Sequence, residues 1–150
     1  MRAKSLIAVL FLFLLVSCQG EKGNDEPISV EYLGADATKP FCEAVRVGAL
    51  LILSGQLGID PDTGKLVPGG IKAETRQTME NIKATLEKYG SSMNRVVKCT
   101  AMLADISEWG DMNQIYVTYF PRYKPARSAF GASGLAMGAR VEIECWATLK

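Results

Sequence analysis

The run from residue 141 to residue 149 alternates strictly between two kinds of side chain. One set is apolar (Val141, Ile143, Cys145, Ala147 and Leu149), and the set between them is Glu142, Glu144, Trp146 and Thr148. Because successive side chains of a strand point to opposite faces of a sheet, this run predicts a strand with one apolar face. The rest of the chain must supply a layer that covers that face.

Two stretches upstream have the period of amphipathic helices. The first covers residues 71–89 and is followed by Gly90, which can end a helix in the left-handed conformation. Its apolar positions recur at steps of three and four: Met79, Ile82, Leu86 and Tyr89. The second helix begins at a cap, Asp105 or Ser107, and ends before Pro121. It places on one face Trp109, Met112, Tyr116 and Tyr119. Both stripes are more typical of core than of a ligand site.

Short runs rich in β-branched and apolar residues predict the remaining strands. They cover residues 28–33, 44–47, 50–54, 95–104 and 127–132. The turn at Gly48-Ala49 predicts a hairpin, the segment 55–58 is expected to leave the sheet, and 95–104 is expected to be a central strand. Strands and helices in this order predict an α+β fold, a mixed sheet with two helices on one face.

The uncovered face of that sheet then carries Trp146 beside Glu142 and Glu144. A large apolar side chain such as Trp146 is rarely left exposed to water on a broad sheet face. We therefore expect an oligomer that covers this face, with sites near its interfaces.

The first 27 residues differ from the domain that follows. Residues 1–17 combine a basic start with a twelve-residue apolar run, too short to span a bilayer, and predict a secretory signal peptide. The sequence Leu15-Val16-Ser17-Cys18 resembles a bacterial lipobox, so we expect Cys18 to carry lipid and 18–27 to be a flexible tether. The alternatives are an ordinary cleaved signal or an uncleaved anchor. Gln19 after Cys18 favours the outer membrane of a bacterial cell envelope.

Charge and missing residue types exclude several functions. Removal of residues 1–17 changes the formal net charge from +1 to −1, which argues against a nucleic-acid partner. The chain contains no histidine, so Ser-His-Asp and Cys-His catalysis, His-ligated zinc and the usual ribonuclease acid and base are excluded. Besides Cys18 the chain has Cys42, Cys99 and Cys145, an odd number that allows either free thiols or one disulfide and one thiol.

Two residues near the end of the chain have the chemistry of a small-acid site. Arg127 presents a planar fork that can bind a carboxylate through two bonds, and Glu142 can accept a proton or hold a water. Their spacing alone fits equally well two surface residues whose ion pairs contribute little to the stability of the fold.

An ordered set of motifs covers nearly all of residues 28–150. The pieces are PFCEAV at 40–45, SGQ at 54–56, Gln77-Thr78 with Asn81-Ile82, Asn113 with Tyr116 and Phe120, PARS at 125–128, and VEIE at 141–144. In order and spacing this set resembles the RidA/YjgF (L-PSP) family, proteins that deaminate reactive enamines and imines.

The resemblance implies a chorismate-mutase-like fold in a homotrimer, with a cleft at each subunit boundary. It implies that Arg127 clamps the carboxylate of a 2-imino or 2-keto acid and that Glu142 helps place the attacking water. Further pocket contacts carried over by the resemblance come from Phe41, Ser54, Gly55, Asn113 and Ala129. It implies neither cofactor nor metal, because a protonated imine is already electrophilic and needs mainly positioning.

The chain also departs from the family's pattern. Phe41 stands where many members have Tyr, Glu43 where they have Gln, and Ala129 where they have Cys. A carboxylate at Glu43 would repel an anionic substrate if it faced the cleft, and Cys42 is either cleft-lining or buried. The alternative function is a non-catalytic trimer that binds small carboxylates or other envelope proteins. Endoribonuclease activity, a common family label, is disfavoured by the charge and the missing histidine.

Overall fold

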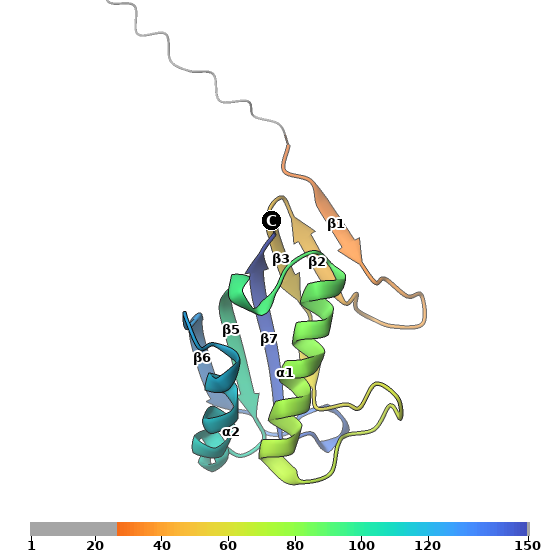
Figure 1. Cartoon of the computed structure of the whole chain (residues 1–150). Helices are drawn as coiled ribbons and strands as arrows, with labels where there is room; N and C mark the ends of the chain where they lie inside the picture. Colours follow the sequence, from red (N-terminus) through yellow and green to blue (C-terminus); the bar gives the residue numbers. More distant parts are fainter. Residues whose placement is uncertain (1–26, 150) are drawn as a thin grey trace, which may run out of the picture.

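The computed structural model describes residues 27–149, which form a mixed sheet with two helices against one of its faces (Figure 1). The seven strands follow the order β1-β2-β3-β7-β5-β6, and β4 pairs with β7 beside this path. The predicted α+β architecture is confirmed. The expected signal peptide, Cys18 and the tether up to residue 26 lie outside the described residues. Within residues 27–149, every helix is too short or too polar to cross a membrane.

The strands and helices match the predicted segments closely, with one addition. The strands are β1 Val30–Leu33, β2 Ala44–Val47, β3 Leu50–Leu53, β4 Gln56–Leu57, β5 Val96–Leu103, β6 Ala126–Gly131 and β7 Val141–Thr148. The helices are α1 Gly70–Lys88 and α2 Trp109–Tyr116. β2 and β3 form the predicted hairpin, and β5 lies between β7 and its parallel neighbour β6.

Strand β7 is the centre of the sheet, with β5 on one side and both β3 and β4 on the other. Its apolar set is buried beneath the helices: Val141, Ile143, Cys145 and Ala147. Its other face is partly open, and the Trp146 side chain remains 39% exposed. The alternation therefore predicted both faces of this strand correctly.

The segment 55–58 was expected to leave the sheet, and this expectation is wrong. Gln56 lies opposite Ile143 and Leu57 opposite Glu142, whereas Ile52 lies opposite Trp146. Between the pairs of Ile52 and Gln56, the β3–β4 segment has three residues and β7 has two, which defines a one-residue bulge.

Gly58, which belongs to the segment that was expected to leave the sheet, is needed for close packing on α1. A Cβ at this position would lie 2.7 Å from the Cα of Glu74. The side chain of Asn81 on α1 also holds the segment, since its Nδ2 donates to the carbonyls of Leu57 and Ile59 at 3.0 and 2.8 Å. The segment 55–58 therefore stays beneath α1, although its glycines predicted that the chain would leave the sheet there.

Helix α1 contributes the predicted stripe to the core, with Met79, Ile82 and Leu86 fully buried. Gly90 has a φ of 82°, and its N–H donates to the carbonyl of Glu87 at 3.2 Å. The next N–H, of Ser91, donates to the carbonyl of Leu86 at 2.8 Å. These two bonds satisfy the last carbonyls of the helix and confirm the predicted stop.

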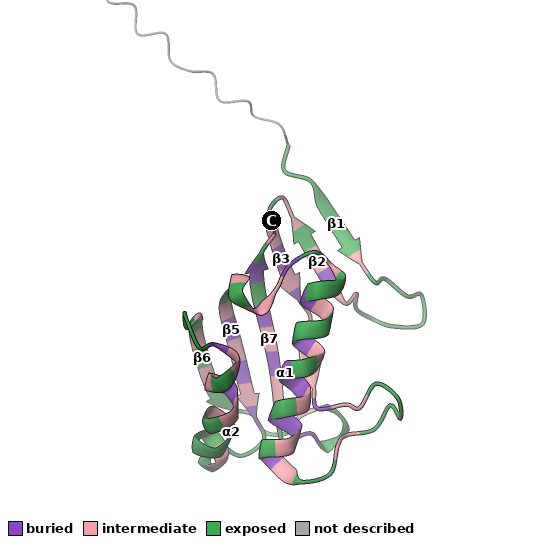
Figure 2. Ribbon diagram, viewed as in Figure 1, coloured by how far each residue is buried: buried purple, intermediate pink, exposed green. Residues whose placement is uncertain are grey.

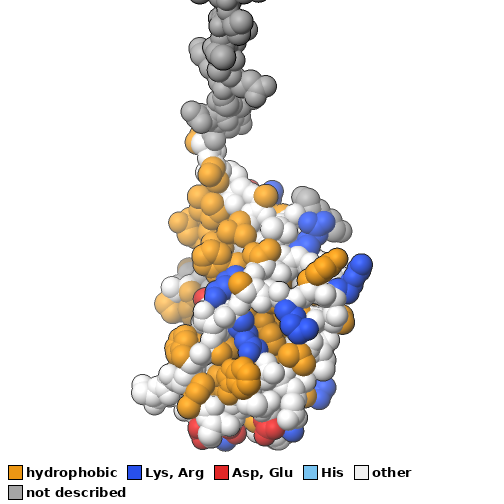
Figure 3. All heavy atoms as spheres, turned by 90° about the vertical axis from the view of Figure 1, so that its left-hand side faces the viewer, with side chains coloured by type: hydrophobic (Ala, Val, Ile, Leu, Met, Phe, Trp, Pro, Cys, Tyr) orange, Lys and Arg blue, Asp and Glu red, His pale blue; other side chains and the backbone are white. Residues whose placement is uncertain are grey.

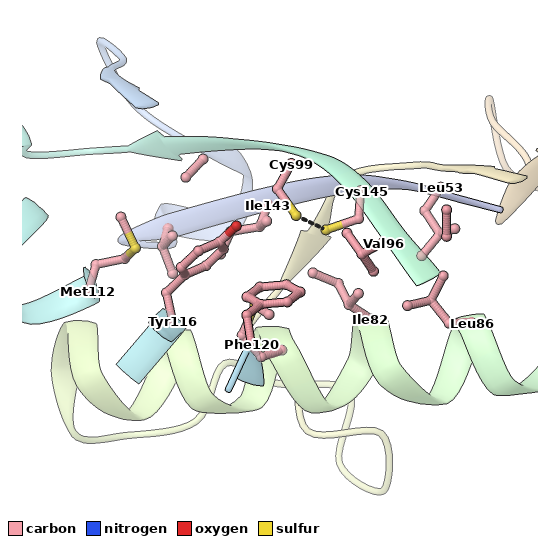
Figure 4. Close-up of a cluster of buried hydrophobic side chains, with 14 of the residues drawn as sticks. Leu53, Ile82, Leu86, Val96, Cys99, Met112, Tyr116, Phe120, Ile143 and Cys145 are labelled. Atoms are coloured by element: carbon pink, nitrogen blue, oxygen red, sulfur yellow. Dashed lines mark hydrogen bonds between the residues drawn. The ribbon is translucent and has the colours of Figure 1, made fainter. Parts of the chain in front are cut away.

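Helix α2 is shorter than predicted because 3₁₀ turns replace its ends. Asp105 accepts a hydrogen bond from the N–H of Ser107 at 2.9 Å, which caps the turn Ile106–Glu108 before the helix. The buried residues of the two helices meet the sheet in one core (Figures 2 and 4). Phe120, outside the predicted stripe, is buried against Tyr116 with ring centroids 4.9 Å apart.

The opposite face of the sheet has no helix over it in the described chain. Phe130 on β6 is 48% exposed there, beside Met102 of β5 and on the same face as Trp146. Figure 3 shows hydrophobic side chains gathered on the side of the molecule nearest β6, with lysines and arginines among them. The predicted uncovered face is therefore present and partly apolar.

Candidate functional site

Arg127 is held in a fixed position by three residues of one helix. On β6 it lies beside Cys99 of β5, so its side chain turns toward the helices. Its Nη1 donates to Oδ1 of Asn113 at 2.9 Å, and its guanidinium carbon lies 4.6 Å from the ring centroid of Tyr116 and 5.4 Å from that of Trp109. The three supporting residues share one face of α2 because they are spaced by four and three.

This support leaves the guanidinium able to bind an anion. The aromatic rings attract a cation through their faces without using its N–H groups. A guanidinium has five N–H donors, so the bond to Asn113 leaves enough of them for a carboxylate. Burial raises the pKa of Tyr116 far above its ordinary value, so this ring stays neutral beneath Arg127. The resulting arrangement, which we call the arginine clamp (Arg127, Asn113, Tyr116 and Trp109), can recognise a small carboxylic acid.

The sequence missed part of the arginine clamp. Tyr116, assigned to the core stripe of the second helix, is buried as predicted, but Trp109, assigned to the same stripe, is 41% exposed. Their spacing to Asn113 was the signal available, since residues four and three apart on a helix are neighbours. Ala129, predicted to line the pocket, lies two residues along β6 on the same face as Arg127.

Glu142 lies on the other face of the sheet, where Gly55 makes room for it. Its neighbours across the strands are Leu57 of β4 and Met102 of β5. A Cβ on Gly55 would collide with Oε1 of Glu142 and would lie 2.9 Å from its carboxyl carbon. The carboxylate thus occupies the space that a side chain at Gly55 would fill, and only glycine fits there.

A cleft of about 610 Å³ opens beside this bulge, between α1 and the strands. Phe41, Ser54 and Gly55, three of the predicted pocket residues, line it together. The hydroxyl of Ser54 donates to the carbonyl of Cys42 at 2.6 Å, which ties the end of β3 to the segment before β2. Cys42 itself is half-buried and lines a smaller adjoining hollow with Phe41.

Glu43 also lines the cleft, but its charge is compensated. Lys88 Nζ and the hydroxyl of Tyr89 each donate to its Oε2 at 2.7 Å. These two bonds, from Lys88 first, hold the pKa of Glu43 below its ordinary value. Lys39 lines the same cleft. Lys39 and Lys88 together outweigh the single negative charge of Glu43, so the cleft is suited to an anion. Glu43 is therefore not expected to repel an anionic substrate.

The predicted site residues therefore fall into two groups within one chain. Arg127, Asn113 and Ala129 gather on the helix-covered face at the β6 edge. The second group, around the β3–β4 bulge, is Phe41, Ser54, Gly55 and Glu142. Arg127 and Glu142 lie on opposite faces of the sheet, with β5 between their strands. Among residues 27–149, no three Cys, Asp or Glu side chains converge as metal ligands would.

Comparison with known proteins places this geometry in a family. The family model described as Endoribonuclease L-PSP matches residues 33–149. The chain belongs to the L-PSP family. It is 44% identical over 108 residues to the mouse protein named 2-iminobutanoate/2-iminopropanoate deaminase, an alignment that covers 72% of this chain and 80% of the mouse protein. The family predicted from the ordered motifs is thus confirmed.

Solved structures of L-PSP relatives share the fold. The crystal structure of RidA from an Antarctic Psychrobacter species superposes with a TM-score of 0.71 at 37% identity, covering 83% of this chain and 99% of that one. The Escherichia coli protein TdcF, crystallised with bound serine, gives a TM-score of 0.71 at 27% identity, covering 79% of this chain and 94% of TdcF.

Proposed function

We propose that this chain hydrolyses the imine and enamine forms of small amino acids, of the 2-iminopropanoate type, to 2-keto acids and ammonia. The observation that carries the proposal is the arginine clamp, a guanidinium fixed by Asn113 and two aromatic rings. The name of the mouse relative supports it, and the function predicted from the sequence agrees with that name. The serine bound to TdcF, a molecule with the same carboxylate, is also consistent with a small-acid site.

The chemistry needs only positioned groups and water. Water oxygen attacks the imine carbon, the C=N electron pair moves to nitrogen, and a proton from the water completes the amine of a carbinolamine. The C–N bond then breaks, ammonia leaves with the hydroxyl proton, and a C=O bond remains. In this proposal Arg127 binds the substrate carboxylate, while Glu142 accepts a hydrogen bond from the attacking water and orients it.

The proposal includes an oligomer, in which Arg127 of one subunit meets Glu142 of a neighbour. Support comes from the separation of the two groups by the sheet, since one chain cannot bring both to one substrate. The face without a helix carries Trp146 and Phe130, which a second copy would remove from water. A closed homotrimer, as the family resemblance implies, satisfies both requirements.

We also propose that lipid on Cys18 tethers the domain in the bacterial cell envelope, on the outer membrane. This part rests on the sequence of residues 15–18. Mass spectrometry of the membrane fraction tests it: lipid mass should be present on the natural chain and absent from a Cys18→Ala chain. A Cys18→Ala chain that still carries lipid contradicts it.

The activity test compares imine decay with and without the protein. An amino-acid oxidase generates 2-iminopropanoate from alanine, and the release of ammonia is followed over time. We expect the natural chain to accelerate release and Arg127→Ala to lose about 100-fold or more of that acceleration. The matched control is Arg122→Ala, because Arg122 is exposed and lies over the exposed ring of Tyr123. Equal decay with and without protein contradicts the deaminase proposal. If pyruvate also raises the melting temperature of the chain, the result indicates the alternative function, a non-catalytic protein that binds small carboxylates.

The oligomer is tested separately by mass in solution. Trp146→Glu places a charge on the face without helices and should shift a trimer to the monomer mass. Val97→Glu serves as the control, since Val97 is already 45% exposed at the register shift of β5 and β7. A natural chain that runs as a monomer contradicts this part of the proposal.

A further inference from the structure

Cys99 and Cys145 lie directly opposite each other on neighbouring strands of the core. They form a register pair of β5 and β7, and both side chains turn to the helix-covered face, where each is fully buried. Residues in direct register on antiparallel strands have Cα atoms about 4.5–5.5 Å apart, and a disulfide bridges Cα atoms about 4.4–6.8 Å apart. The backbone therefore already places these residues within bridging range.

The side chains are turned toward each other as well. The two Sγ atoms are 2.6 Å apart, in contact within the core (Figure 4). Cys42 lies on a different segment, half-buried beside the cleft, and is not part of this pair. From sequence alone any two of the three cysteines, or none, were candidates for pairing. Register and burial now single out one pair.

The geometry points to a disulfide between Cys99 and Cys145 as the oxidised state of this chain, with Cys42 left as a free thiol. The link joins the two central strands at 46 residues of separation. It lies beneath Tyr116, whose ring supports Arg127, so it fixes the sheet under the arginine clamp.

The reaction is a thiol–disulfide exchange with a small disulfide such as oxidised glutathione. The thiolate of one of the two cysteines attacks one sulfur of that disulfide, which forms a mixed disulfide and releases one thiolate. The sulfur of the other cysteine, after losing its proton, attacks the first Sγ, forms the internal bond and releases the second thiolate. Two cysteine thiols are thus oxidised and one small disulfide is reduced to two thiols, which take up the two protons. Because both sulfurs are buried in the folded chain, the exchange takes place while the strands are forming.

The two thiols also differ within the folded chain. The hydrogen bond that they share lowers the pKa of the Cys99 thiol. The same hydrogen bond, together with burial, raises the pKa of Cys145.

Peptide mapping of the full-length chain tests the link. The chain is refolded with oxidised glutathione, remaining thiols are alkylated, and trypsin is added. Peptides 99–122 and 141–150 should appear joined, and dithiothreitol should separate them; Cys42, in peptide 23–46, should be alkylated. Cys42→Ala should keep the linked pair, and Cys145→Ala should lose it. Alkylation of both Cys99 and Cys145 in the natural chain overturns the inference.

Thermal unfolding provides a second measurement that does not depend on digestion. The oxidised chain should unfold roughly 10 °C above the reduced chain, because the link closes a long loop in the unfolded state. Cys42→Ala should show the same difference between the two states, and Cys145→Ala should show none. A difference that persists in Cys145→Ala, or is lost only in Cys42→Ala, assigns the effect to another thiol and overturns the inference.

Discussion

The two groups of site residues are built in different ways. The arginine clamp is complete within one chain, because Asn113, Tyr116 and Trp109 position Arg127 before any ligand arrives. The group around the β3–β4 bulge has its carboxylate, Glu142, on a face that the described chain leaves open. The proposed recognition of the carboxylate thus depends on groups that one chain already holds in place, whereas the proposed hydrolysis depends on assembly. The following experiments, from the largest expected effect to the smallest, test this difference.

Substitution of Glu142 should separate it from its neighbour on the same face. We expect Glu142→Gln to lower the deaminase rate about 100-fold, because a neutral amide oxygen is a weaker hydrogen-bond acceptor than a carboxylate and orients the attacking water less well. Glu144→Gln is the matched control, two residues along β7 and opposite Thr100, and should change the rate less than about threefold. Ammonia release reports both, and an equal loss in the two variants would show that Glu142 has no special role.

Mixing two inactive variants should restore activity if each site takes one group from each subunit. Arg127→Ala and Glu142→Gln chains are unfolded together and refolded in equal amounts. Random closed trimers should then recover about a quarter of the natural rate, since one site in four pairs an intact Arg127 with an intact Glu142. Each variant refolded alone is the control. A mixture no more active than its components would mean that both groups must come from the same chain.

Removal of the amide that holds Arg127 should weaken recognition. Asn113→Ala leaves the two aromatic contacts in place but frees the guanidinium to move. We expect KM to rise about 10-fold with a smaller change in kcat, as for a loss of ground-state positioning. Gln114→Ala, at an exposed position on the same helix, should leave KM unchanged. A fall in kcat at constant KM would instead indicate a role in the chemical step.

Glu43→Gln should have the smallest effect and a defined pH dependence. The pKa of Glu43 is lowered by Lys88 and Tyr89, so its contribution to stability is present above the unfolded value near 4.5. That contribution is lost as the pH falls through the lower folded pKa. The variant should melt about 1–2 °C below the natural chain at pH 7, and this difference in melting temperature should shrink as the pH falls below the unfolded pKa. A difference that does not depend on pH would instead indicate an effect of the substitution on packing. Glu87→Gln, an exposed acid on α1, is the control.

The sequence predicted elements whose signal is local. The alternation of β7, the stripe of α1 and its stop at Gly90 each depend on residues close together in the chain, and each was correct. β4 was missed because a two-residue strand has no pattern of its own and exists only through its pairing with β7. Gly58 appeared to break the strand, but its role is close packing against Glu74.

The sequence supplied candidate site residues by type but not their arrangement. Arg127 and Glu142 have the chemistry of a small-acid site, and the motifs supplied their expected partners. Their separation by the sheet follows from strand order, which no spacing in the sequence shows. The same holds for Cys99 and Cys145, whose pairing depends on the register of two strands 46 residues apart.

The bulge between β3 and β4 also limits how this chain can change length during evolution. Because the extra residue lets Ile52 pair with Trp146 and Gln56 pair with Ile143, loss of one residue between them would remove the bulge and make the pairing regular. If the lost residue were Gly55, a side chain would take its place beside Glu142 and collide with the carboxylate. Insertions are tolerable in the turn at Pro61–Gly64, which is exposed. We therefore expect functional relatives to vary in length at that turn and to keep the spacing from Ile52 to Gln56 unchanged.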